Sequence, residues 1–346
     1  MKNSDRRIVY AGTTDRPFFK ELWSDFSRRR VQELGFNVEI PTFTKDASKE
    51  EWLKFLAGAE GIVTTWNSPC IDQSVLDVAP NLSIMGHAAG SLAGYVSPEL
   101  FASGAKVCGA NDDMAFSVAE WCLMGALMGR RSVTNYTGFG AASLPIFPDR
   151  AKGCRTIRNA VVGIWGFGAV AAHLVKLLQP LMPAKILVNS RHMSADEAAQ
   201  RGVELADFDT VVSESEIIFT LAGLSEHTVG RFNAEKLKLV RDGAVLVNGG
   251  RGDLFDEAAL IAELQTGRIS AVLDVFHTEP LPPESPLNRM PNVILTPHNA
   301  GYPSRFRYIA TVLEEFDRCF RGEPLLFEVN AAQIEFMTVN LRKLAK

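Results

Sequence analysis

Short apolar runs alternate with amphipathic segments along most of the chain. In the first part, strand-like runs are expected at 7–12, 37–40, 61–66 and 82–86. One segment with helical spacing, 18–34, lies between the first two of these runs. Strands separated by helical patterns indicate a parallel sheet with crossover helices.

The longest helical pattern covers residues 113–131, with an aspartate at its start and two arginines at its end, as the helix dipole favours. A connection that contains Gly and Pro, 137–153, separates it from a second series of strand-like runs. These are expected at 161–166, 185–190, 216–221, 244–249, 269–275 and 292–296. Helical patterns such as 256–267 lie between most of them, which is typical of a doubly wound sheet. One more helix is expected over 305–322.

Composition limits the classes of function. With 346 residues, the chain is long enough for two domains, each with its own core. A net charge of −4 argues against a general nucleic-acid surface. The most apolar stretch, 114–128, is interrupted by Glu120 and too short to span a bilayer, so no membrane partner is expected. The 5 cysteines have no CxxC pair and no ligand spacing, which predicts reduced thiols in a cytoplasmic protein and no metal site.

The segment GFGAVA, 166–171, follows an apolar run and opens a helical pattern. Gly166 allows a tight turn there, and Gly168 lets backbone N–H groups approach a pyrophosphate at the helix N-terminus. Ala171 takes the place of the third glycine of a dinucleotide fingerprint, where only close packing is needed. The alternative is a glycine turn in another α/β protein, such as a methyltransferase.

The end of the next strand bears on the choice of cofactor. An acidic residue at that place would bind the ribose hydroxyls of NAD, whereas an arginine suits a 2′-phosphate. The sequence is Asn189-Ser190-Arg191-His192, with no acid. We therefore expect NADP(H) to be favoured over NAD(H), with Ser190 and Arg191 at the phosphate; an exposed arginine at a strand end is the alternative.

Three polar side chains follow three of the predicted strands. Arg251 follows the run that ends in LVNG, Glu279 follows LDV, and His298 follows VILTP. Because ligands bind at the carboxyl edge of a parallel sheet, these side chains are expected at a ligand site. Reduction of a keto acid needs a cation for the carboxylate and a tuned acid/base for the hydroxyl proton, and these residue types provide both.

The motifs NGGRGDLFDEAAL (248–260), LDVFHTEP (273–280) and TPH (296–298) resemble the catalytic half of the D-isomer-specific 2-hydroxyacid dehydrogenases. That family includes glyoxylate/hydroxypyruvate reductases, D-lactate dehydrogenases and phosphoglycerate dehydrogenases. The resemblance covers about 161–301 and, more faintly, about 60–131.

The resemblance implies a role for each matching residue. Arg251 would bind the substrate carboxylate and polarise the keto oxygen, and His298 would be the general acid/base. Glu279 would bond to His298 and keep its imidazolium form available near neutral pH. Asp274 would face the nicotinamide end of the cofactor. The full set of implied cofactor contacts is Gly166, Gly168, Ala169, Val170, Ser190, Arg191, Leu221, Gly249, Gly250 and Asp274.

The resemblance also implies an α/β fold of two doubly wound parallel-sheet domains. A Rossmann-type cofactor domain, 113–301, would be inserted in a discontinuous flavodoxin-like substrate domain, 1–112 plus 302–346. The partner is expected to be a small 2-keto or 2-hydroxy acid, held in a cleft between the domains. The 113–131 helix is commonly part of a dimer interface in the family, so a homodimer is expected.

The sequence departs from the family at the substrate loop, GHAAGSLAG (86–94). Its small residues still allow the backbone N–H groups of Ala89 and Gly90 to bind a carboxylate. Leu92 stands in place of an acid, and His87 is unusual. A proline is missing from FTLAGLSEHT, and the 137–153 connection lacks the family's tryptophan. These changes suggest a substrate bulkier than glyoxylate or pyruvate.

Two other functions remain open from the sequence. The first is a dinucleotide-sensing regulatory protein on the same fold, as in the C-terminal-binding-protein corepressors, which keep the same three residues. The second is oxidation of phosphite as the hydride donor. Formate is disfavoured because formate dehydrogenases of this superfamily have glutamine where this chain has Glu279.

Overall fold

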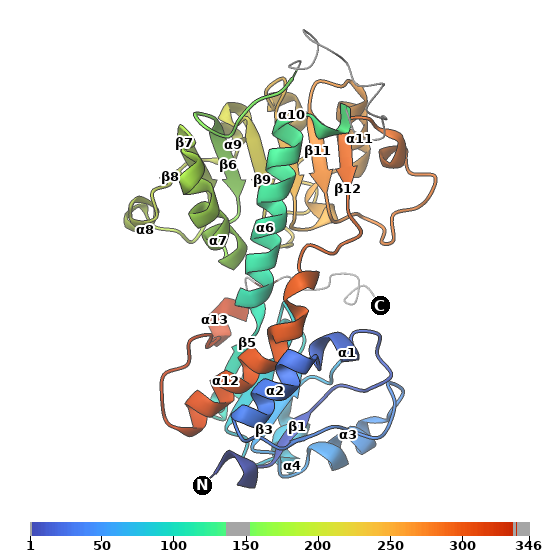
Figure 1. Ribbon diagram of the computed structural model, residues 1–346, viewed down its shortest axis with the longest axis vertical. Helices are drawn as coiled ribbons and strands as arrows, with labels where there is room; N and C mark the ends of the chain where they lie inside the picture. The colour runs from blue at the N-terminus through green and yellow to red at the C-terminus, as the bar shows by residue number, and fades with distance from the viewer. Residues whose placement is uncertain (1, 136–152, 335–336, 338–346) are drawn as a thin grey trace. The chain divides into compact units, whose positions relative to one another are not determined.

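The computed structural model describes residues 2–135, 153–334 and 337. The chain divides into two compact units: unit 1 is 1–114 with 302–346, and unit 2 is 115–301. Each unit contains one parallel sheet with helices packed against it (Figure 1). Most of the predicted 137–153 connection, which lacks the family's tryptophan, lies outside the described residues.

Unit 1 is built on a five-stranded sheet with the order β2-β1-β3-β4-β5, in which every pairing is parallel. This order is that of the flavodoxin-like doubly wound fold. The strands are β1 Ile8–Tyr10, β2 Val38–Glu39, β3 Gly61–Thr64, β4 Ile84–His87 and β5 Lys106–Gly109. The helices are α1 Phe19–Leu22, α2 Asp25–Glu33, α3 Lys49–Leu56, α4 Gln73–Val78, α5 Pro98–Ala102, α12 Tyr308–Phe320 and α13 Ala331–Ile334.

Both faces of this sheet are buried, and the strand residues alternate between two cores. Ile8 and Tyr10 belong to the cluster that contains α12 residues such as Val312 and Phe316. Val9 belongs to the opposite cluster, together with Leu56 of α3. Helix α12, from the last part of the chain, therefore covers one face of a sheet formed by the N-terminal part, as in a discontinuous domain.

The prediction of one continuous helical segment over 18–34 is wrong, because the structure has two helices there. Helix α1 ends at Leu22, and α2 begins at Asp25. Ser24 lies between them and caps α2, since its hydroxyl oxygen accepts a hydrogen bond from the Ser27 N–H at 3.1 Å. The same hydroxyl donates to the Phe306 carbonyl at 2.7 Å. Apolar periodicity continues through this cap, so the pattern alone did not indicate the break.

Unit 2 is built on a seven-stranded parallel sheet with the order β12-β11-β10-β9-β6-β7-β8. Six of these strands follow the Rossmann order, and β12 extends the sheet beyond β11. The strands are β6 Val161–Trp165, β7 Lys185–Asn189, β8 Glu204–Leu205, β9 Ile217–Thr220, β10 Val245–Asn248, β11 Ser270–Leu273 and β12 Val293–Leu295. The helices are α6 Asn111–Arg130, which begins in unit 1, α7 Ala169–Leu178, α8 Ala195–Gln200, α9 Phe208–Glu214, α10 Ala234–Leu239 and α11 Glu257–Gln265. The predicted fold class is confirmed.

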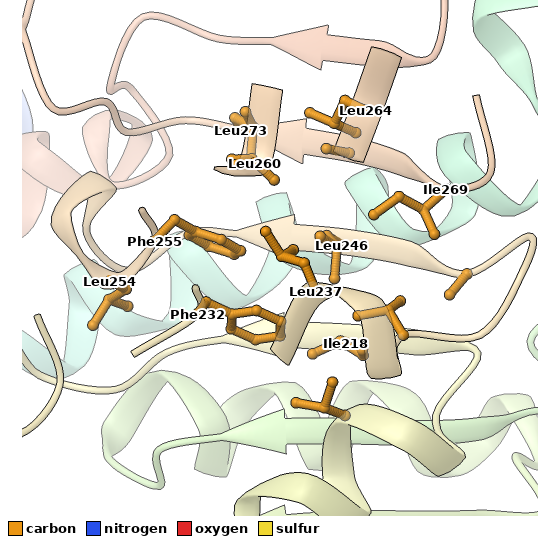
Figure 2. Close-up of a cluster of buried hydrophobic side chains, with 14 of the residues drawn as sticks. Ile218, Phe232, Leu237, Leu246, Leu254, Phe255, Leu260, Leu264, Ile269 and Leu273 are labelled. Atoms are coloured by element: carbon orange, nitrogen blue, oxygen red, sulfur yellow. The ribbon is translucent and has the colours of Figure 1, made fainter. Parts of the chain in front are cut away.

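Different helices pack on the two faces of the unit 2 sheet. Figure 2 shows one core, where Leu237 of α10 and Leu260 of α11 pack with Leu246 of β10. Helix α6 packs on strands β10 and β11 through small residues. A side chain added at Gly125 would lie 2.9 Å from Val272, and one added at Gly129 would lie 2.4 Å from Val245. The helix is therefore held close to the strands that carry the site described next.

Within the described residues, no helix combines the length and apolarity that a membrane span needs.

Candidate active site

The strand order brings the three predicted catalytic side chains to one edge of unit 2. Strands β10, β11 and β12 are consecutive in the sheet. Arg251 comes three residues after β10, Glu279 six residues after β11, and His298 three residues after β12. Because the strands are parallel, all three residues follow carboxyl ends at the same edge, where this architecture binds ligands.

His298 and Glu279 form a hydrogen-bonded pair. The His298 Nδ1 atom lies 2.7 Å from a carboxylate oxygen of Glu279. The other carboxylate oxygen accepts from the Phe276 N–H at 3.0 Å. Burial raises the pKa of Glu279, but the hydrogen bonds from His298 and Phe276 outweigh it, and the pKa lies below its usual value. Glu279 is thus ionised near neutral pH and fixes the ring through Nδ1, which leaves Nε2 as the nitrogen for proton exchange.

A buried carboxylate holds the loop that carries His298. Asp274 is 2% exposed, and one of its oxygens accepts from the Thr296 hydroxyl at 2.5 Å and from the Asn299 N–H at 3.0 Å. The other oxygen accepts from the Ala300 N–H at 2.9 Å. Both oxygens of Asp274 are therefore engaged by residues 296–300, on both sides of His298.

The backbone of His298 is in the left-handed region, with φ at 54°. For a residue other than glycine this conformation costs about 1–3 kcal/mol and persists only where the surroundings impose it. The three hydrogen bonds to Asp274 provide that constraint. We refer to Asp274 with residues 296–300 as the Asp274 latch.

Arg251 follows β10, the neighbour of the strand that Glu279 follows. Burial lowers the pKa of its guanidinium, and the negative charges of Glu279 and Asp253 partly oppose this effect. Its Nη1 donates to the Gly250 carbonyl at 2.7 Å. Asn248 holds the loop, because its side-chain amide donates to the Arg251 carbonyl at 3.0 Å. A partly buried cation beside Glu279 is suited to binding a carboxylate.

Gly252 allows the loop after β10 to touch the loop after β11. A Cβ atom at this position would lie 2.2 Å from the backbone carbon of Phe276 and 2.6 Å from the His277 nitrogen. His277 reinforces the contact, since its Nε2 lies 2.9 Å from the Phe255 carbonyl oxygen. The spacing between Arg251 and Glu279 therefore depends on the absence of a side chain at Gly252.

The glycine-rich loop after β6 fits the phosphates of a dinucleotide. Gly166 has φ at +93°, and a Cβ atom there would lie 2.4 Å from the Ala222 backbone, so the turn requires glycine. Gly168 is the N-cap of α7 without a side-chain cap, and no atom lies within 4 Å of the place a Cβ would take. The first turn of α7, with Ala169 and Val170, thus has an open approach to its N-terminus, where backbone N–H groups and the dipole favour anions.

The remaining predicted cofactor contacts follow other strands of the same sheet. Ser190 and the exposed Arg191 follow β7, and the Ser190 hydroxyl oxygen accepts from the His192 N–H at 3.4 Å. Leu221 follows β9, and its N–H donates to the Trp165 carbonyl at 2.8 Å. The last two contacts, Gly249 and Gly250, follow β10. A Cβ atom at Gly249 would lie 2.9 Å from the Cys122 sulfur, and one at Gly250 would lie 2.6 Å from the Thr220 carbonyl oxygen.

The predicted substrate loop belongs to unit 1. Ala89 and Gly90 follow β4, and no hydrogen bond from either backbone N–H to another described residue is found. Leu92 is fully buried in a unit 1 core, which explains the apolar residue in place of the family's acid.

His87 is a buried and neutral residue of the same unit. It is 0% exposed, and burial lowers its pKa to about 3. Its Nδ1 lies 2.9 Å from the Thr64 hydroxyl, and its ring lies against Tyr95 with centroids 4.4 Å apart. His87 thus supports the start of the loop and carries no charge there at neutral pH.

Two features of the site were not predicted from the sequence. The Asp274 latch was missed because a strand-end aspartate gives no sign of where its oxygens point. The signal that could have indicated it is Thr296. It follows β12 directly, as Asp274 follows β11, and the two strands are neighbours, so its hydroxyl lies beside the Asp274 carboxylate. The close approach of Gly252 to the Phe276 backbone was also missed. The glycine directly after Arg251 in the sequence is the signal that could have indicated it.

Comparisons with known proteins point to one family. Residues 146–300 match the family model described as D-isomer specific 2-hydroxyacid dehydrogenase, NAD binding domain. An Archaeoglobus fulgidus protein named D-3-phosphoglycerate dehydrogenase is 27% identical over 312 residues, which are 88% of this chain and 57% of that protein. Glyoxylate/hydroxypyruvate reductase B of Escherichia fergusonii is 32% identical over 169 residues, 48% of this chain and 52% of that protein. The matched regions thus span little more than half the length of these two relatives.

A solved structure shares the fold over nearly the whole chain. The crystal structure of a phosphoglycerate oxidoreductase from Rhizobium etli has a TM-score of 0.80 at 24% identity, with 94% of this chain and 99% of that chain covered. Residues 146–300 are thus similar to the NAD binding domain of the D-isomer specific 2-hydroxyacid dehydrogenases, and both relatives support this family. The resemblance seen in the sequence motifs is confirmed.

Proposed function

We propose that this protein is an NAD(P)-dependent oxidoreductase that interconverts a 2-oxo acid and a D-2-hydroxy acid. The 2.7 Å pair of His298 and Glu279, at the sheet edge where Arg251 also lies, carries the proposal. An acid/base fixed by a carboxylate next to a partly buried cation is the arrangement that proton transfer to a keto oxygen needs.

Each of the three side chains has one task. Arg251 binds the substrate carboxylate through its planar fork and polarises the keto oxygen. His298 donates a proton from Nε2 to that oxygen during reduction and removes it during oxidation. Glu279 orients the ring and stabilises the imidazolium. The nicotinamide nucleotide, when bound, supplies or accepts the hydride.

The substrate loop provides the second contact for the carboxylate. The backbone N–H groups of Ala89 and Gly90 bind it, an assignment favoured by the lack of a hydrogen-bond acceptor for them among the described residues. The small residues of 86–94, with Leu92 turned into the core, favour a substrate bulkier than glyoxylate or pyruvate.

The cofactor is NADP(H) in preference to NAD(H). Gly166, Gly168, Ala169 and Val170 hold the pyrophosphate at the start of α7. Ser190 and Arg191 bind the 2′-phosphate, since the chain has no acid at the end of β7 that would repel it. Leu221, Gly249, Gly250 and Asp274 line the rest of the cofactor site.

The protein acts as a cytoplasmic homodimer, with a substrate domain of 1–112 plus 302–346 and a cofactor domain of 113–301. The outer face of α6 supports the dimer, because Phe116, Met124 and Leu127 are 44%, 42% and 40% exposed. Apolar side chains gathered on one helix face are typical of an interface. Light scattering tests this part: a mass twice the 37.9 kDa of the chain is expected, and a monomer mass contradicts it.

A panel of 2-oxo acids tests the activity. The purified protein is mixed with NADPH or NADH and each acid, and loss of the reduced-nicotinamide absorbance is followed. Turnover with at least one acid, faster with NADPH, is expected. No turnover with any acid and either cofactor would reject the proposed activity, and a preference for NADH would reject the role of Ser190 and Arg191.

A further inference from the structure

Unit 2 contains a cavity at the edge of its sheet opposite the proposed active site. The cavity has a volume of about 200 Å³. It is lined by the C-terminal end of α6, by Gly153 and Arg155, and by the turns that lead into β10 and β11. All of its described lining residues belong to unit 2. Neither the cofactor residues nor the three catalytic side chains take part in it.

Arg130, at the end of α6, lines this cavity with a buried guanidinium. Its side chain is 5% exposed. Its Nη2 donates to the Thr156 carbonyl at 2.8 Å and to the Glu216 carboxylate at 3.1 Å, and its Nε also donates to Thr156. The third nitrogen, Nη1, is buried and has no acceptor among the residues that the structure describes. Buried donors are nearly always paired, so this atom indicates that an acceptor belongs beside it.

Arg155 brings a second guanidinium to the same cavity. Its backbone N–H donates to the Arg130 carbonyl at 2.6 Å, which joins the two residues. Its side chain is 51% exposed and lies over Gly243, where a Cβ atom would be 3.3 Å from Nη2. Its Nη1 is 4.0 Å from the Glu216 oxygen that Arg130 also contacts. The two guanidinium groups therefore share this one carboxylate.

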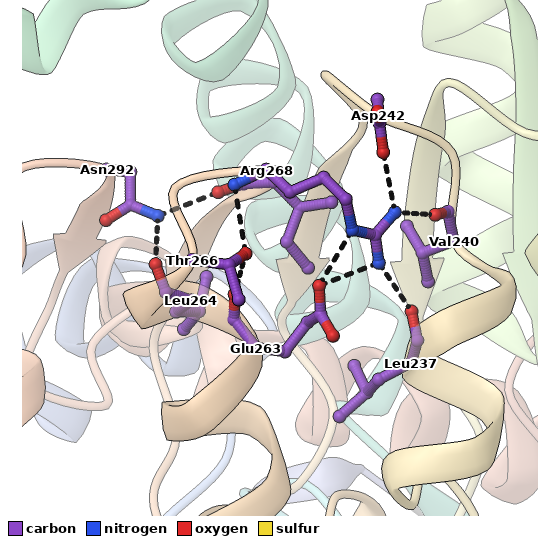
Figure 3. Close-up of polar contacts among 9 residues, drawn as sticks. Leu237, Val240, Asp242, Glu263, Leu264, Thr266, Arg268 and Asn292 are labelled. Atoms are coloured by element: carbon purple, nitrogen blue, oxygen red, sulfur yellow. Dashed lines mark hydrogen bonds and ion pairs between the residues drawn. The ribbon is translucent and has the colours of Figure 1, made fainter.

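A third arginine of the wall, Arg268, is already saturated, as Figure 3 shows. Its Nε donates to Glu263 at 2.9 Å, and its Nη2 donates to the Leu237 carbonyl at 3.0 Å. Its Nη1 donates to Asp242 at 3.0 Å and to the Val240 carbonyl. Arg268 therefore fastens the turns around the cavity and has no donor left for a ligand.

We propose that this cavity binds a small oxyanion, a phosphate or carboxylate group, between Nη1 of Arg130 and the guanidinium of Arg155. The oxyanion would supply the acceptor that Nη1 lacks. The volume agrees with a small ligand, because pockets for larger molecules measure roughly 300–1,000 Å³. The site is independent of the proposed reaction, and strands β10 and β11 separate it from Arg251 and Asp274.

The test uses inorganic phosphate and, separately, acetate as probes at constant ionic strength. Thermal unfolding of the wild type is followed as each anion is titrated, because a ligand that binds the folded state raises the midpoint in a saturable way. Arg155→Ala removes the exposed half of the site, and Arg155→Gln is a second variant that keeps its bulk. Arg158→Ala is the matched control, since Arg158 is exposed, three residues away and outside the cavity.

We expect at least one anion to bind the wild type and Arg158→Ala equally, and to bind both Arg155 variants roughly ten- to hundredfold more weakly, the loss of one charge-assisted hydrogen bond. Amide chemical shifts locate the ion: Gly243 and Ser270 should move in parallel with the stabilisation. Equal binding by the wild type and the Arg155 variants overturns the proposal. Shifts confined to Gly168 overturn it too, because they place the anion at the cofactor loop. So does the absence of saturable binding by either anion.

Discussion

Asp274→Asn tests how His298 is held in place. In the latch, one carboxylate oxygen of Asp274 accepts from Thr296 at 2.5 Å and from Asn299 at 3.0 Å, and the other accepts from Ala300 at 2.9 Å. An asparagine can keep its oxygen at only one of these places. Its NH2 group must then face a donor, and two buried donors oppose each other without an acceptor.

The expected cost follows from these contacts. The variant loses at least one charge-assisted hydrogen bond, about 1.5–3 kcal/mol, and weakens the others by removing the charge. Because Asp274 is 2% exposed, water does not compensate. We expect the free energy of unfolding to fall by about 2–4 kcal/mol. Since a displacement of about 1 Å at a catalytic group can cost about 10²-fold, kcat should fall to a similar extent once 296–300 loosens.

Urea unfolding and steady-state kinetics measure the two effects. Thr296→Val removes one of the three bonds and should produce a smaller loss in both. Asp196→Asn, at an exposed position of α8, is the control and should change neither. The reasoning is refuted if Asp274→Asn keeps wild-type stability and kcat. If the variant loses only cofactor affinity, Asp274 acts through the cofactor alone and the latch has no role in placing His298.

Three further predictions concern the same loops. Gly252→Ala should push the Arg251 and Glu279 loops apart and reduce kcat/KM by at least tenfold with cofactor affinity retained; wild-type kcat/KM contradicts the close contact at Phe276. Arg251→Lys should raise KM for the oxo acid and lower kcat, because a point charge does not reproduce the planar fork; unchanged kinetics would exclude a bidentate contact. Because the pKa of Glu279 is lowered in the folded protein, its stabilising effect is fully present above the unfolded carboxyl value of about 4.3 and is lost as the pH falls through the folded value. The stability difference between the wild type and Glu279→Gln should therefore shrink in acid, and a difference that grows below about pH 4 contradicts the sign.

The architecture was predictable because both sheets are parallel and buried on both faces. Their strands are short continuous apolar runs, and the residue that follows each run can be placed at the carboxyl edge. Arg251, Glu279 and His298 were found in this way. Strands β5 and β8 were missed, since the lysine and glycine of Lys106–Gly109 and the two residues of Glu204–Leu205 give no apolar run.

Other features depend on contacts that a linear pattern does not contain. The break at Ser24 arises from a cap and a bond to the distant Phe306 carbonyl. The role of Asp274 depends on three hydrogen bonds across two loops, and the neutrality of His87 depends on its burial against Tyr95. A strand-end position predicts that a residue lies at the site, whereas tertiary contacts decide which atoms it presents.

The most direct test of the central claim is the turnover of His298→Ala, measured with the best 2-oxo acid of the panel and with the dissociation constant of the reduced cofactor determined on the same sample. General acid–base catalysis contributes about 10²–10⁴-fold. We predict that kcat falls within that range while the cofactor dissociation constant stays within about twofold of the wild type. Wild-type turnover by the variant would contradict the assignment of His298 as the proton donor and with it the proposed dehydrogenase mechanism.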